Sequence, residues 1–365
     1  MTPQNEENPY LPQLRKALHE IGVDSDWLAT AWTPSQTLNT LLSPFELVVC
    51  RLRGFNLIHL HWVYKFSWWW TRRLPLVNKV PRWWFAFMLW FANAIGFRIV
   101  YTSHEPLPLA PAFDDDRAGR RPLLRRSRVV ITITEDAKRC LSEFFGVDPK
   151  LIEVIPEGAP ALGTAPPRED ARKQLGVPTA TPLVAMFGHL DPYKGVDLLL
   201  EAILELPSTT ELCLRLLGKA RDSEYAMKLD DLVRRLNRQG RDARWDNGVF
   251  PDEELNVLLS AADLVAIPFR WITNSTSLRV AMSRRVPVLV PDLPELRDVP
   301  AAAVFRYDHS AATGLRDELA AALRASPKET AARVAAAYEW TTAWTWHDVA
   351  VATKAVYERA LQVAP

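Results

Sequence analysis

The chain has few cysteines and no long apolar run, and both absences restrict its class. Its three cysteines, Cys50, Cys140 and Cys213, lie far apart and form no Cys-x-x-Cys pair. Their odd number and spacing exclude a disulfide framework and favour a reducing compartment. The longest apolar stretch, residues 83–97, is shorter than the ~20 residues that a membrane-spanning helix needs. The N-terminal residues lack the apolar core of a signal segment, so we expect a cytoplasmic protein.

Neither positive nor negative charge is in clear excess over the whole chain, although the basic residues are unevenly spread. The 365 residues carry a formal net charge of +1, which gives no bulk attraction to polyanions. No recognised nucleic-acid-binding motif accompanies the basic residues, so we expect no nucleic-acid partner. Between residues 65 and 104 there is no Asp or Glu, and the basic residues there alternate with tryptophan.

Short apolar runs alternate with longer helical patterns, which is typical of parallel βαβ units. A Pro-, Ala- and Gly-rich segment at 159–170 has the composition of a linker, and the pattern restarts after it. We therefore expect an α/β chain with two doubly wound domains and a cleft between them, at the carboxyl ends of their strands. The expected strands are 56–62, 97–105, 128–134 and 152–158 before the linker, and 182–188, 211–218, 263–269 and 286–292 after it. The expected helices include 8–22, 134–146, 196–206, 224–240, 252–262, 275–285 and most of 329–362.

The first candidate for chemistry is the run FGHLDPYKGVDLLLEAI at 187–203. An expected strand ends at Gly188, and a turn containing Lys194 and Gly195 leads directly into an expected helix. Backbone N–H groups and the helix dipole favour an anion at such a helix start, and the lysine adds a point charge. The pattern indicates a phosphate site, although a tight turn with a solvated lysine fits the same residues.

Two further stretches have residues suited to a cleft. Ser275, Thr276 and Ser277 open a second helix after an expected strand, so they are either a second phosphate-binding helix start or ordinary N-caps. His104 and Glu105 follow the expected strand at 97–105. A histidine there is a candidate general base because its pKa lies close to neutral, or it packs locally within the domain.

Together these stretches resemble the GT-B glycosyltransferases related to the GT4 group. The run 187–203 is similar to the group's Gly-Arg-x3-Glu-Lys-Gly turn and its helix, and NSTSLRVAMSRRVPVLVPD at 274–292 is similar to a subgroup form of the donor loop. The order of further short motifs agrees over nearly the whole chain. Those motifs are NPYLPQLRKAL, HLHW, YTSHE, VIPEG, FPDEELNVLLSAADLVAIPF and WTWHDVAVATKAVYERAL.

The resemblance implies a GT-B fold with two Rossmann-like domains, a nucleotide-sugar co-substrate and no separate cofactor. It implies an acceptor-binding domain at 1–165, a nucleotide-sugar-binding domain at 166–335 and a last helix, 336–365, that crosses back to the first domain. The donor-binding residues implied by position are Gly188, His189, Lys194, Asn274, Ser275, Thr276, Ser277, Glu157 and Gly158. The implied acceptor-binding residues are Asn8, Tyr10, His61 and Trp62, and the implied catalytic residues are His104 and Glu105.

The sequence departs from the family pattern at several of these positions. The chain also begins almost at Tyr10, so the first strand expected before it is either absent or replaced. The departures are His189 in place of arginine, Ile272 and Val280 in place of glutamates separated by seven residues, Thr276 in place of glycine, and Glu105 in place of asparagine.

Glycosyl transfer requires stabilisation of a leaving nucleoside diphosphate, which Lys194 and helix N–H groups suit without a metal ion. We therefore expect no metal site. The nearest acidic cluster, Asp114–Asp116, has the surroundings of a solvated turn. An inverting enzyme needs one base for the acceptor hydroxyl, for which His104 or Glu105 is suited, whereas in a retaining enzyme these residues would position the donor sugar.

The segment 65–91 combines tryptophan with arginine and is the least core-like part of the sequence. This combination is typical of elements at a membrane interface. Residues 83–95 predict a helix with aromatic side chains almost all round, which suits either a buried crossover helix or a membrane-facing one. For the residues before it we expect a surface position and peripheral contact with the inner face of the membrane. The residues of that contact are Trp68, Trp69, Trp70, Arg72 and Arg73.

Our preferred hypothesis is an enzyme. It is a metal-independent glycosyltransferase that moves a sugar from a UDP- or GDP-sugar to a glycan, glycolipid or glycosylated natural-product acceptor. The alternative is a non-catalytic, nucleotide-sugar-binding partner subunit with a GT-B fold, which the departures above motivate. An epimerase or phosphorylase of this fold ranks lower, because neither a rich set of carboxylates nor a lysine for a pyridoxal cofactor stands out.

Overall fold

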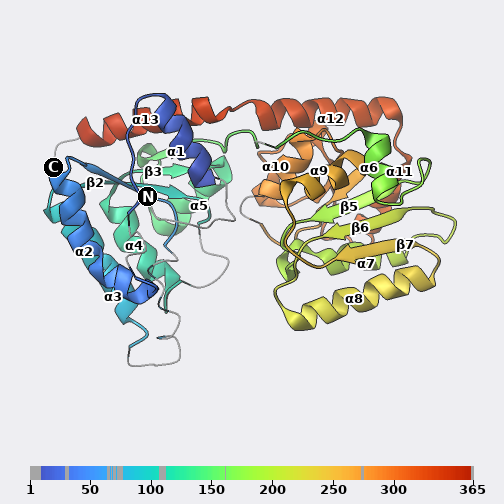
Figure 1. Cartoon of the computed structure of the whole chain (residues 1–365), viewed down its shortest axis with the longest axis horizontal. Coiled ribbons are helices and arrows are strands. Elements are labelled where there is room, and N and C mark those ends of the chain that lie inside the picture. The colour runs from blue at the N-terminus through green and yellow to red at the C-terminus, as the bar shows by residue number, and fades with distance from the viewer. Residues whose placement is uncertain are drawn as a thin grey trace. The chain divides into compact units, whose positions relative to one another are not determined.

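The structure is a computed structural model, and it describes residues 10–28, 33–63, 66, 68, 71, 77–106, 112–160, 162–272 and 275–362. The chain divides into two compact units. The first comprises residues 1–158 and 344–365, and the second comprises residues 159–343 (Figure 1).

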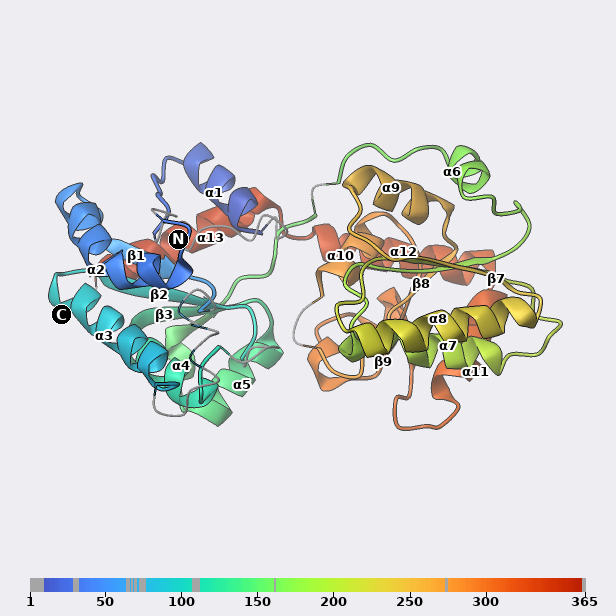
Figure 2. The same cartoon turned by 60° about the horizontal axis from the view of Figure 1, so that its bottom comes forward.

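The first unit is built on a parallel four-stranded sheet in the order β1-β2-β3-β4. Figure 2 shows α1 and α13 on one face of this sheet and α3 and α4 on the other. The strands are β1 (Leu57–Leu60), β2 (Arg98–Ser103), β3 (Ser127–Thr132) and β4 (Ile152–Val154). The helices are α1 (Tyr10–Glu20), α2 (Gln36–Leu52), α3 (Val80–Ala94), α4 (Asp116–Arg126), α5 (Glu135–Phe145) and α13 (Trp346–Gln362), with a short 3-10 turn at Pro149–Leu151.

Alternation along the strands produces two cores, one on each face of the first sheet. Ile99 and Tyr101 of β2 pack with side chains of α2, α3 and α4. Val100, between them, packs with α1 and α13 on the opposite face. A strand buried on both faces needs such continuous apolar residues, which is why the sequence pattern indicated a parallel sheet.

The second unit is built on a parallel six-stranded sheet in the order β10-β9-β8-β5-β6-β7. The strands are β5 (Leu183–Phe187), β6 (Cys213–Leu217), β7 (Asp242–Asp246), β8 (Leu264–Ala266), β9 (Val288–Pro291) and β10 (Phe305–Tyr307). The helices are α6 (Arg168–Gln174), α7 (Val196–Leu204), α8 (Ser223–Arg238), α9 (Asp252–Ala261), α10 (Thr276–Ser283), α11 (Gly314–Arg324) and α12 (Pro327–Thr342). Short 3-10 turns lie at Pro192–Lys194, Pro294–Leu296 and Ala301–Ala303.

The strand order of the second sheet reverses between β5 and β8. The chain runs outward from β5 to β6 and β7, and then returns to the other side of β5 to form β8, β9 and β10. In a doubly wound sheet, ligands bind beyond the carboxyl ends of the strands at such a reversal. The segments that follow Phe187 of β5 and Ala266 of β8 are therefore the natural place for a ligand.

The structure confirms most of the expected elements and adds two strands that the sequence did not predict. Helix α5 begins at the cap Thr134, whose side chain accepts from the N–H of Ala137, and ends at Gly146 with φ 67°. The missed strands are β10 and β7, which form the two edges of the second sheet. The charged residues of β7 alternate with apolar ones, and edge strands tolerate such charge because one side faces solvent.

The structure tests two expectations about the tryptophan-rich segment at 65–95. Helix α3 buries Phe85 and Leu89 on one side and exposes Trp83 and Trp90 on the other, so it is neither wholly buried nor wholly exposed. Trp68 is only 5% exposed, and its expected surface position is therefore wrong. Trp69, Trp70, Arg72 and Arg73 lie outside the described residues. Among the described helices, none combines the length and apolar character needed to cross a bilayer.

Candidate functional site

The turn after β5 places Lys194 at the reversal of the second sheet. Gly188 follows the strand with φ 91°, and Gly195, with φ 68°, ends the 3-10 turn and begins α7. The Lys194 side chain is 5% exposed and points back toward the strand end. Its Nζ donates to the carbonyl oxygen of Phe187 at 3.1 Å and to Oγ of Ser277 at 3.1 Å.

Three glycines of the second unit have a positive φ, and a Cβ at any of them would meet a close contact. A Cβ on Gly188 would lie 2.9 Å from Nζ of Lys194. A Cβ on Gly195 would lie 2.1 Å from the carbonyl oxygen of Pro268, and one on Gly218 would lie 1.8 Å from that of Gly188. The backbone contacts leave no room for a side chain at Gly195 or Gly218, so the loops after β5, β6 and β8 meet backbone to backbone at these two residues. Gly218 was missed as a site residue, although it ends an expected strand.

Lys194 is a buried cation in this arrangement. Burial lowers its pKa to about 8, the nearby charge of Asp191 partly counters this effect, and that of Arg221 adds to it. No carboxylate in the described part of the chain forms an ion pair with Lys194. A buried charge is costly unless a counter-charge accompanies it, so the position is prepared for an anion.

A second group of charges holds the turn in place. Asp197, in the first turn of α7, accepts from Nη1 and Nη2 of Arg270 at 2.7 and 2.9 Å, from Nζ of Lys228 at 2.6 Å and from Oη of Tyr225 at 2.8 Å. Burial alone would raise the pKa of Asp197, but these donors outweigh it and hold the pKa well below its usual range. Arg270 also donates to the carbonyl oxygen of Pro192 at 2.8 Å. The Asp197–Arg270 ion pair ties the turn at 188–195 to the segment after β8, and sequence reasoning missed this pair.

The residues expected beside the turn are placed as follows. Ser275 caps α10 by accepting from the N–H of Leu278 at 3.1 Å, while Ser277 contacts Lys194. Thr276 is exposed, His189 is half-buried, and Asn274 lies outside the described residues. Ile272 and Val280 are buried in the core of the second unit. The positions of the family's paired glutamates therefore serve packing in this chain.

The first unit contains an aromatic and histidine cluster at the carboxyl end of its sheet. His104 follows β2 and is half-buried, with the Trp62 ring stacked on it at 4.1 Å and 12°. The ring of Tyr10 meets His104 edge-on at 4.6 Å. Nδ1 of His61 lies 3.1 Å from Nε2 of His104, so the two imidazoles share a hydrogen bond.

His104 is neutral in this environment. Burial, and then the charge of Arg120, lowers its pKa to about 3. The expectation of a pKa close to neutral is therefore wrong, because a ring packed between Trp62 and Tyr10 loses the hydration that stabilises the imidazolium. A neutral imidazole still provides the lone pair that a base needs.

The other expected residues of this unit lie around His104. Tyr10 and His61 are 4% and 1% exposed, so they contact the buried side of His104. Trp62 is half-buried beside it. Burial, and then the charge of Glu157, raises the pKa of Tyr10. Gly158 packs on an indole ring, since a Cβ there would lie 2.7 Å from Trp346. Asn8 lies outside the described residues.

The backbone after His104 is fixed by a buried arginine that sequence reasoning missed. Nη1 of Arg120 donates to Oη of Tyr101 at 2.8 Å and to the carbonyl oxygen of Glu105. The hydroxyl of Ser103 donates to the same carbonyl at 3.0 Å. Glu105 itself is buried. Arg120 thus fixes the backbone at Glu105, the residue directly after His104.

His59 is a further member of the cluster that sequence reasoning missed. Its Nδ1 lies 2.7 Å from Oη of Tyr357 in α13, and its Nε2 lies 2.7 Å from Oγ1 of Thr102. The period of two along a strand places His59 and His61 on one face, so the motif HLHW carried the signal.

The acidic cluster Asp114–Asp116 serves the start of α4. Oδ1 of Asp115 accepts from the N–H of Ala118, and Oδ1 of Asp116 accepts from those of Ala112 and Phe113. Among the described residues there is no group of three or more His, Cys, Asp or Glu side chains arranged to hold a metal ion.

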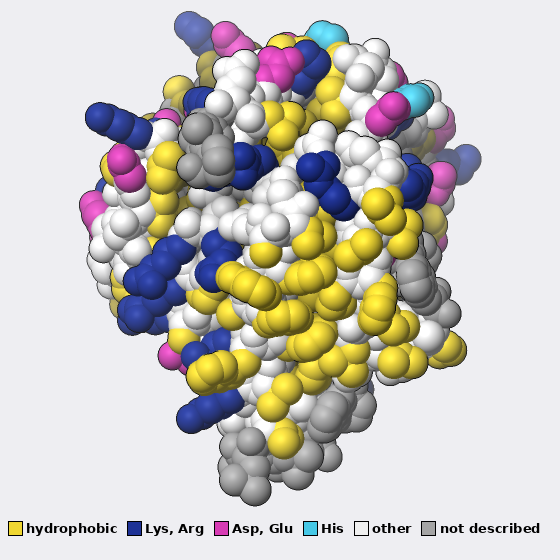
Figure 3. Space-filling view, turned by 90° about the vertical axis from the view of Figure 1, so that its left-hand side faces the viewer, with side chains coloured by type: hydrophobic (Ala, Val, Ile, Leu, Met, Phe, Trp, Pro, Cys, Tyr) yellow, Lys and Arg dark blue, Asp and Glu magenta, His cyan; other side chains and the backbone are white. Residues whose placement is uncertain are grey.

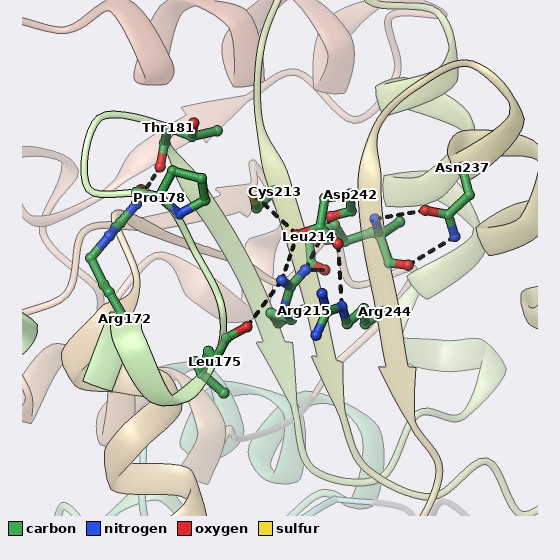
Figure 4. Close-up of polar contacts among 11 residues, drawn as sticks. Arg172, Leu175, Pro178, Thr181, Cys213, Leu214, Arg215, Asn237, Asp242 and Arg244 are labelled. Carbon is green, nitrogen blue, oxygen red and sulfur yellow. Dashed lines mark hydrogen bonds and ion pairs between the residues drawn. The ribbon is translucent and has the colours of Figure 1, made fainter. Parts of the chain in front are cut away.

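Buried arginines hold the second sheet together away from Lys194. Arg215 of β6 donates to Oδ2 of Asp242, at the start of β7, at 2.6 Å and to the carbonyl oxygens of Asp242, Leu214 and Leu175 (Figure 4). Arg172 of α6 donates to the carbonyl of Pro178 at 2.6 Å and to that of Thr181. These contacts are structural, because each guanidinium is directed at backbone or at a paired carboxylate.

Comparison with known families accounts for both halves of the chain. Residues 10–161 match the family described as Glycosyltransferase Family 4, and residues 167–340 match Glycosyl transferases group 1. This chain belongs to the GT-B glycosyltransferases related to the GT4 group. The glycosyltransferase is 27% identical over 275 residues to D-inositol 3-phosphate glycosyltransferase of Nocardia farcinica, covering 71% of this chain and 57% of the relative. It is 26% identical over 304 residues to the same-named protein of Corynebacterium aurimucosum, covering 72% and 68%.

The match to a third relative is shorter. The protein of that name from Rhodococcus erythropolis is 29% identical over 186 residues, covering 47% of this chain and 42% of the relative. The glycosyltransferase therefore spans about half the length of the curated relatives it matches.

Solved structures show the same fold. Sucrose-phosphate synthase from Thermosynechococcus elongatus has a TM-score of 0.73 at 18% identity, covering 99% of this chain and 94% of that chain. Anabaena HepE, solved in complex with UDP and glucose, has a TM-score of 0.65 at 18% identity, covering 95% and 89%. The fold of this glycosyltransferase is GT-B, with two Rossmann-like domains.

Proposed function

We propose that this glycosyltransferase moves a sugar from a UDP- or GDP-sugar to a hydroxyl group of a glycan, glycolipid or glycosylated natural product. The proposal rests on one observation: Lys194 is a buried cation at the point where the strand order of the second sheet reverses. Its Nζ bonds to Phe187 and Ser277, and no described carboxylate pairs with it. The diphosphate of a nucleotide sugar is an anion of the right chemistry to pair with it.

The reaction needs a positive charge for the leaving group and a base for the acceptor hydroxyl. The acceptor oxygen attacks the anomeric carbon, the bond from that carbon to the diphosphate oxygen breaks, and the nucleoside diphosphate leaves with the electron pair. Lys194 would stabilise the charge that develops on the leaving diphosphate. The acceptor proton would pass to the neutral imidazole of His104, whose low pKa would rise when the negative charge of a bound donor is present.

The identity of the donor and acceptor is inferred by analogy. Anabaena HepE was solved in complex with UDP-glucose, which favours a uridine nucleotide as the first donor to test. The curated relatives are named for transfer to an inositol phosphate, which favours a polar, hydroxyl-rich acceptor. We propose that protein groups meet the diphosphate charge without a metal ion, and that the acceptor is reached at a membrane surface.

The test is calorimetric titration of the full chain with UDP, GDP, TDP and their sugars, in parallel with Lys194→Met and the exposed control Lys173→Met. We expect one nucleotide to bind the wild type and the control equally. Loss of the charge-assisted bonds should weaken binding to Lys194→Met by roughly 10- to 100-fold. Failure of every nucleotide to bind the wild type would overturn the proposal.

A second experiment separates catalysis from binding. His104→Asn should keep the nucleotide affinity of the wild type and slow sugar transfer, or donor hydrolysis, by on the order of 100-fold. Added EDTA should leave the wild-type rate unchanged. Tight nucleotide binding without turnover in wild type and variant alike would instead favour the non-catalytic partner subunit.

A further inference from the structure

Two packed helices of the first unit expose an apolar surface. Helices α2 and α3 contact each other, and ten of the 17 exposed large hydrophobic side chains in the described part of the chain lie on them. Figure 3 shows hydrophobic side chains gathered there over a broad, continuous area. We call this surface the α2–α3 face. Its residues are Leu38, Leu41, Phe45, Val48, Val49, Leu52, Val80, Trp83, Phe87 and Trp90.

Helix α2 is turned with its apolar side outward. Its buried residues include Thr40, Ser43 and Glu46, whereas Phe45 is 67% exposed and Leu52 is 83% exposed. A surface helix in water normally buries its apolar stripe and exposes its polar side. The reversed orientation of α2 therefore indicates that the exposed side meets an apolar environment in the working state of the protein.

The polar side of α2 is matched to α3, so the orientation is built into the packing. The hydroxyl of Ser43 donates to the carbonyl oxygen of Thr40 at 2.5 Å and lies 3.2 Å from Sδ of Met88. The indole N–H of Trp84 donates to the same Thr40 carbonyl at 3.0 Å. Rotating α2 to bury its aliphatic residues would break these contacts with α3.

Positive charge borders this face. Helix α4 packs against α3 and carries Arg117, Arg121 and Arg125 at intervals of four residues, all of them exposed. None of the three pairs with a described carboxylate. Helix α3 contains no acidic residue, and Glu46 of α2 is buried. Figure 3 shows Lys and Arg side chains along one border of the apolar area and few Asp or Glu beside it.

We propose that the α2–α3 face docks this protein onto an anionic lipid bilayer. Trp83, 69% exposed, and Trp90, 52% exposed, are the side-chain type that settles at the headgroup level. The aliphatic residues of α2 enter the acyl boundary, and the α4 arginines meet anionic headgroups. A second copy of the chain would offer the same positive border and no acidic residue on its α2 and α3 surfaces, so a bilayer is the better match.

This docking surface differs from the expected one at residues 68–73, of which Trp68 is buried and Trp69, Trp70, Arg72 and Arg73 lie outside the described residues. The inference deepens the proposed function by naming the membrane partner, and it is tested without sugar transfer. The proposed nucleotide site lies in the second unit, so failure to dock and failure to bind the donor are distinguishable in the same variants.

The experiment is co-sedimentation of the full chain with vesicles of phosphatidylcholine, alone or mixed with phosphatidylglycerol, over a range of salt. The apolar test is Phe45→Ser with Trp83→Ser and Trp90→Ser, and its matched control is the exposed Met227→Ser of α8. We expect the wild type and control to bind the mixed vesicles, and the triple variant to bind on the order of tenfold more weakly or less. Because these side chains are already exposed, unfolding by urea should be unchanged.

The charge test is Arg121→Glu with Arg125→Glu, and its matched control is Arg235→Glu with Arg238→Glu on α8. The α4 variant should lose roughly fivefold in affinity for anionic vesicles per arginine removed, and the control should not. Equal sedimentation of the wild type with and without vesicles would overturn the proposal. So would a wild type that is dimeric by ultracentrifugation and becomes monomeric in the triple variant, because the face would then be a self-association surface.

Discussion

Replacing Lys194 with methionine should reveal the cost of holding a bare cation inside the second unit. Burial shifts the lysine pKa from 10.5 to about 8. This shift corresponds to roughly 3 kcal/mol of lost folding free energy while the lysine is charged in both the folded and unfolded states. Methionine keeps the length of the side chain but removes the charge and the hydrogen bonds to Phe187 and Ser277, which contribute about 1 kcal/mol each.

The sign of the effect changes with pH. Below pH 8 the wild type bears the full cost of the buried charge, so Lys194→Met should be more stable by about 1 kcal/mol. As the pH rises from 8 to 10.5, the unfolded chain retains its proton longer than the folded one, and the wild type gains stability. Near pH 10.5 the variant should be less stable by about 2 kcal/mol, because only its lost hydrogen bonds then count.

The assay is urea unfolding of both proteins in steps from pH 7 to pH 10.5, followed by tryptophan fluorescence. Hydrogen exchange of the β5 amides assigns the transition of the second unit. Lys173→Met, on the surface of α6, is the control and should follow the wild type at every pH. A difference between Lys194→Met and the wild type that stays constant over this range would refute the reasoning, because Lys194 would then not be a buried, destabilised cation.

Further substitutions test the turn that holds Lys194 and the separate Arg215 network. Gly188→Ala places a Cβ 2.9 Å from its Nζ at a residue with φ 91°, so it should weaken nucleotide binding by on the order of tenfold in calorimetry. Gly240→Ala has a similar φ of 84° with nothing within 4 Å, and it should change stability alone. Arg215→Leu removes the buried one of the two arginines paired with Asp242 and the donor to three carbonyls, and it should cost about 3 kcal/mol in urea unfolding. Because the Arg215 network lies away from Lys194, the nucleotide affinity of the folded variant, measured without urea, should equal that of the wild type. A large loss of affinity would show that the two regions are coupled.

The sequence by itself determined the parallel α/β architecture and the geometry of the turn at 188–195. Apolar runs of strand length and capping residues such as Thr134 and Gly146 are local signals, and the structure agrees with them. The turn 188–195 could be predicted because glycine, proline and lysine restrict the backbone and its charge within a few residues. Family resemblance added the order of these motifs along the chain, which the comparisons confirm.

Only the tertiary structure decided how distant residues act on one another. Lys194 meets Ser277, which lies 83 positions later in the chain, and Gly218 meets Gly188 through backbone approach that no local pattern encodes. The pKa of His104 falls because rings from separate elements surround it, so a value based on residue type was wrong. The outward apolar side of α2 is likewise invisible to periodicity, because an amphipathic pattern fixes two faces of a helix but not which face meets the core.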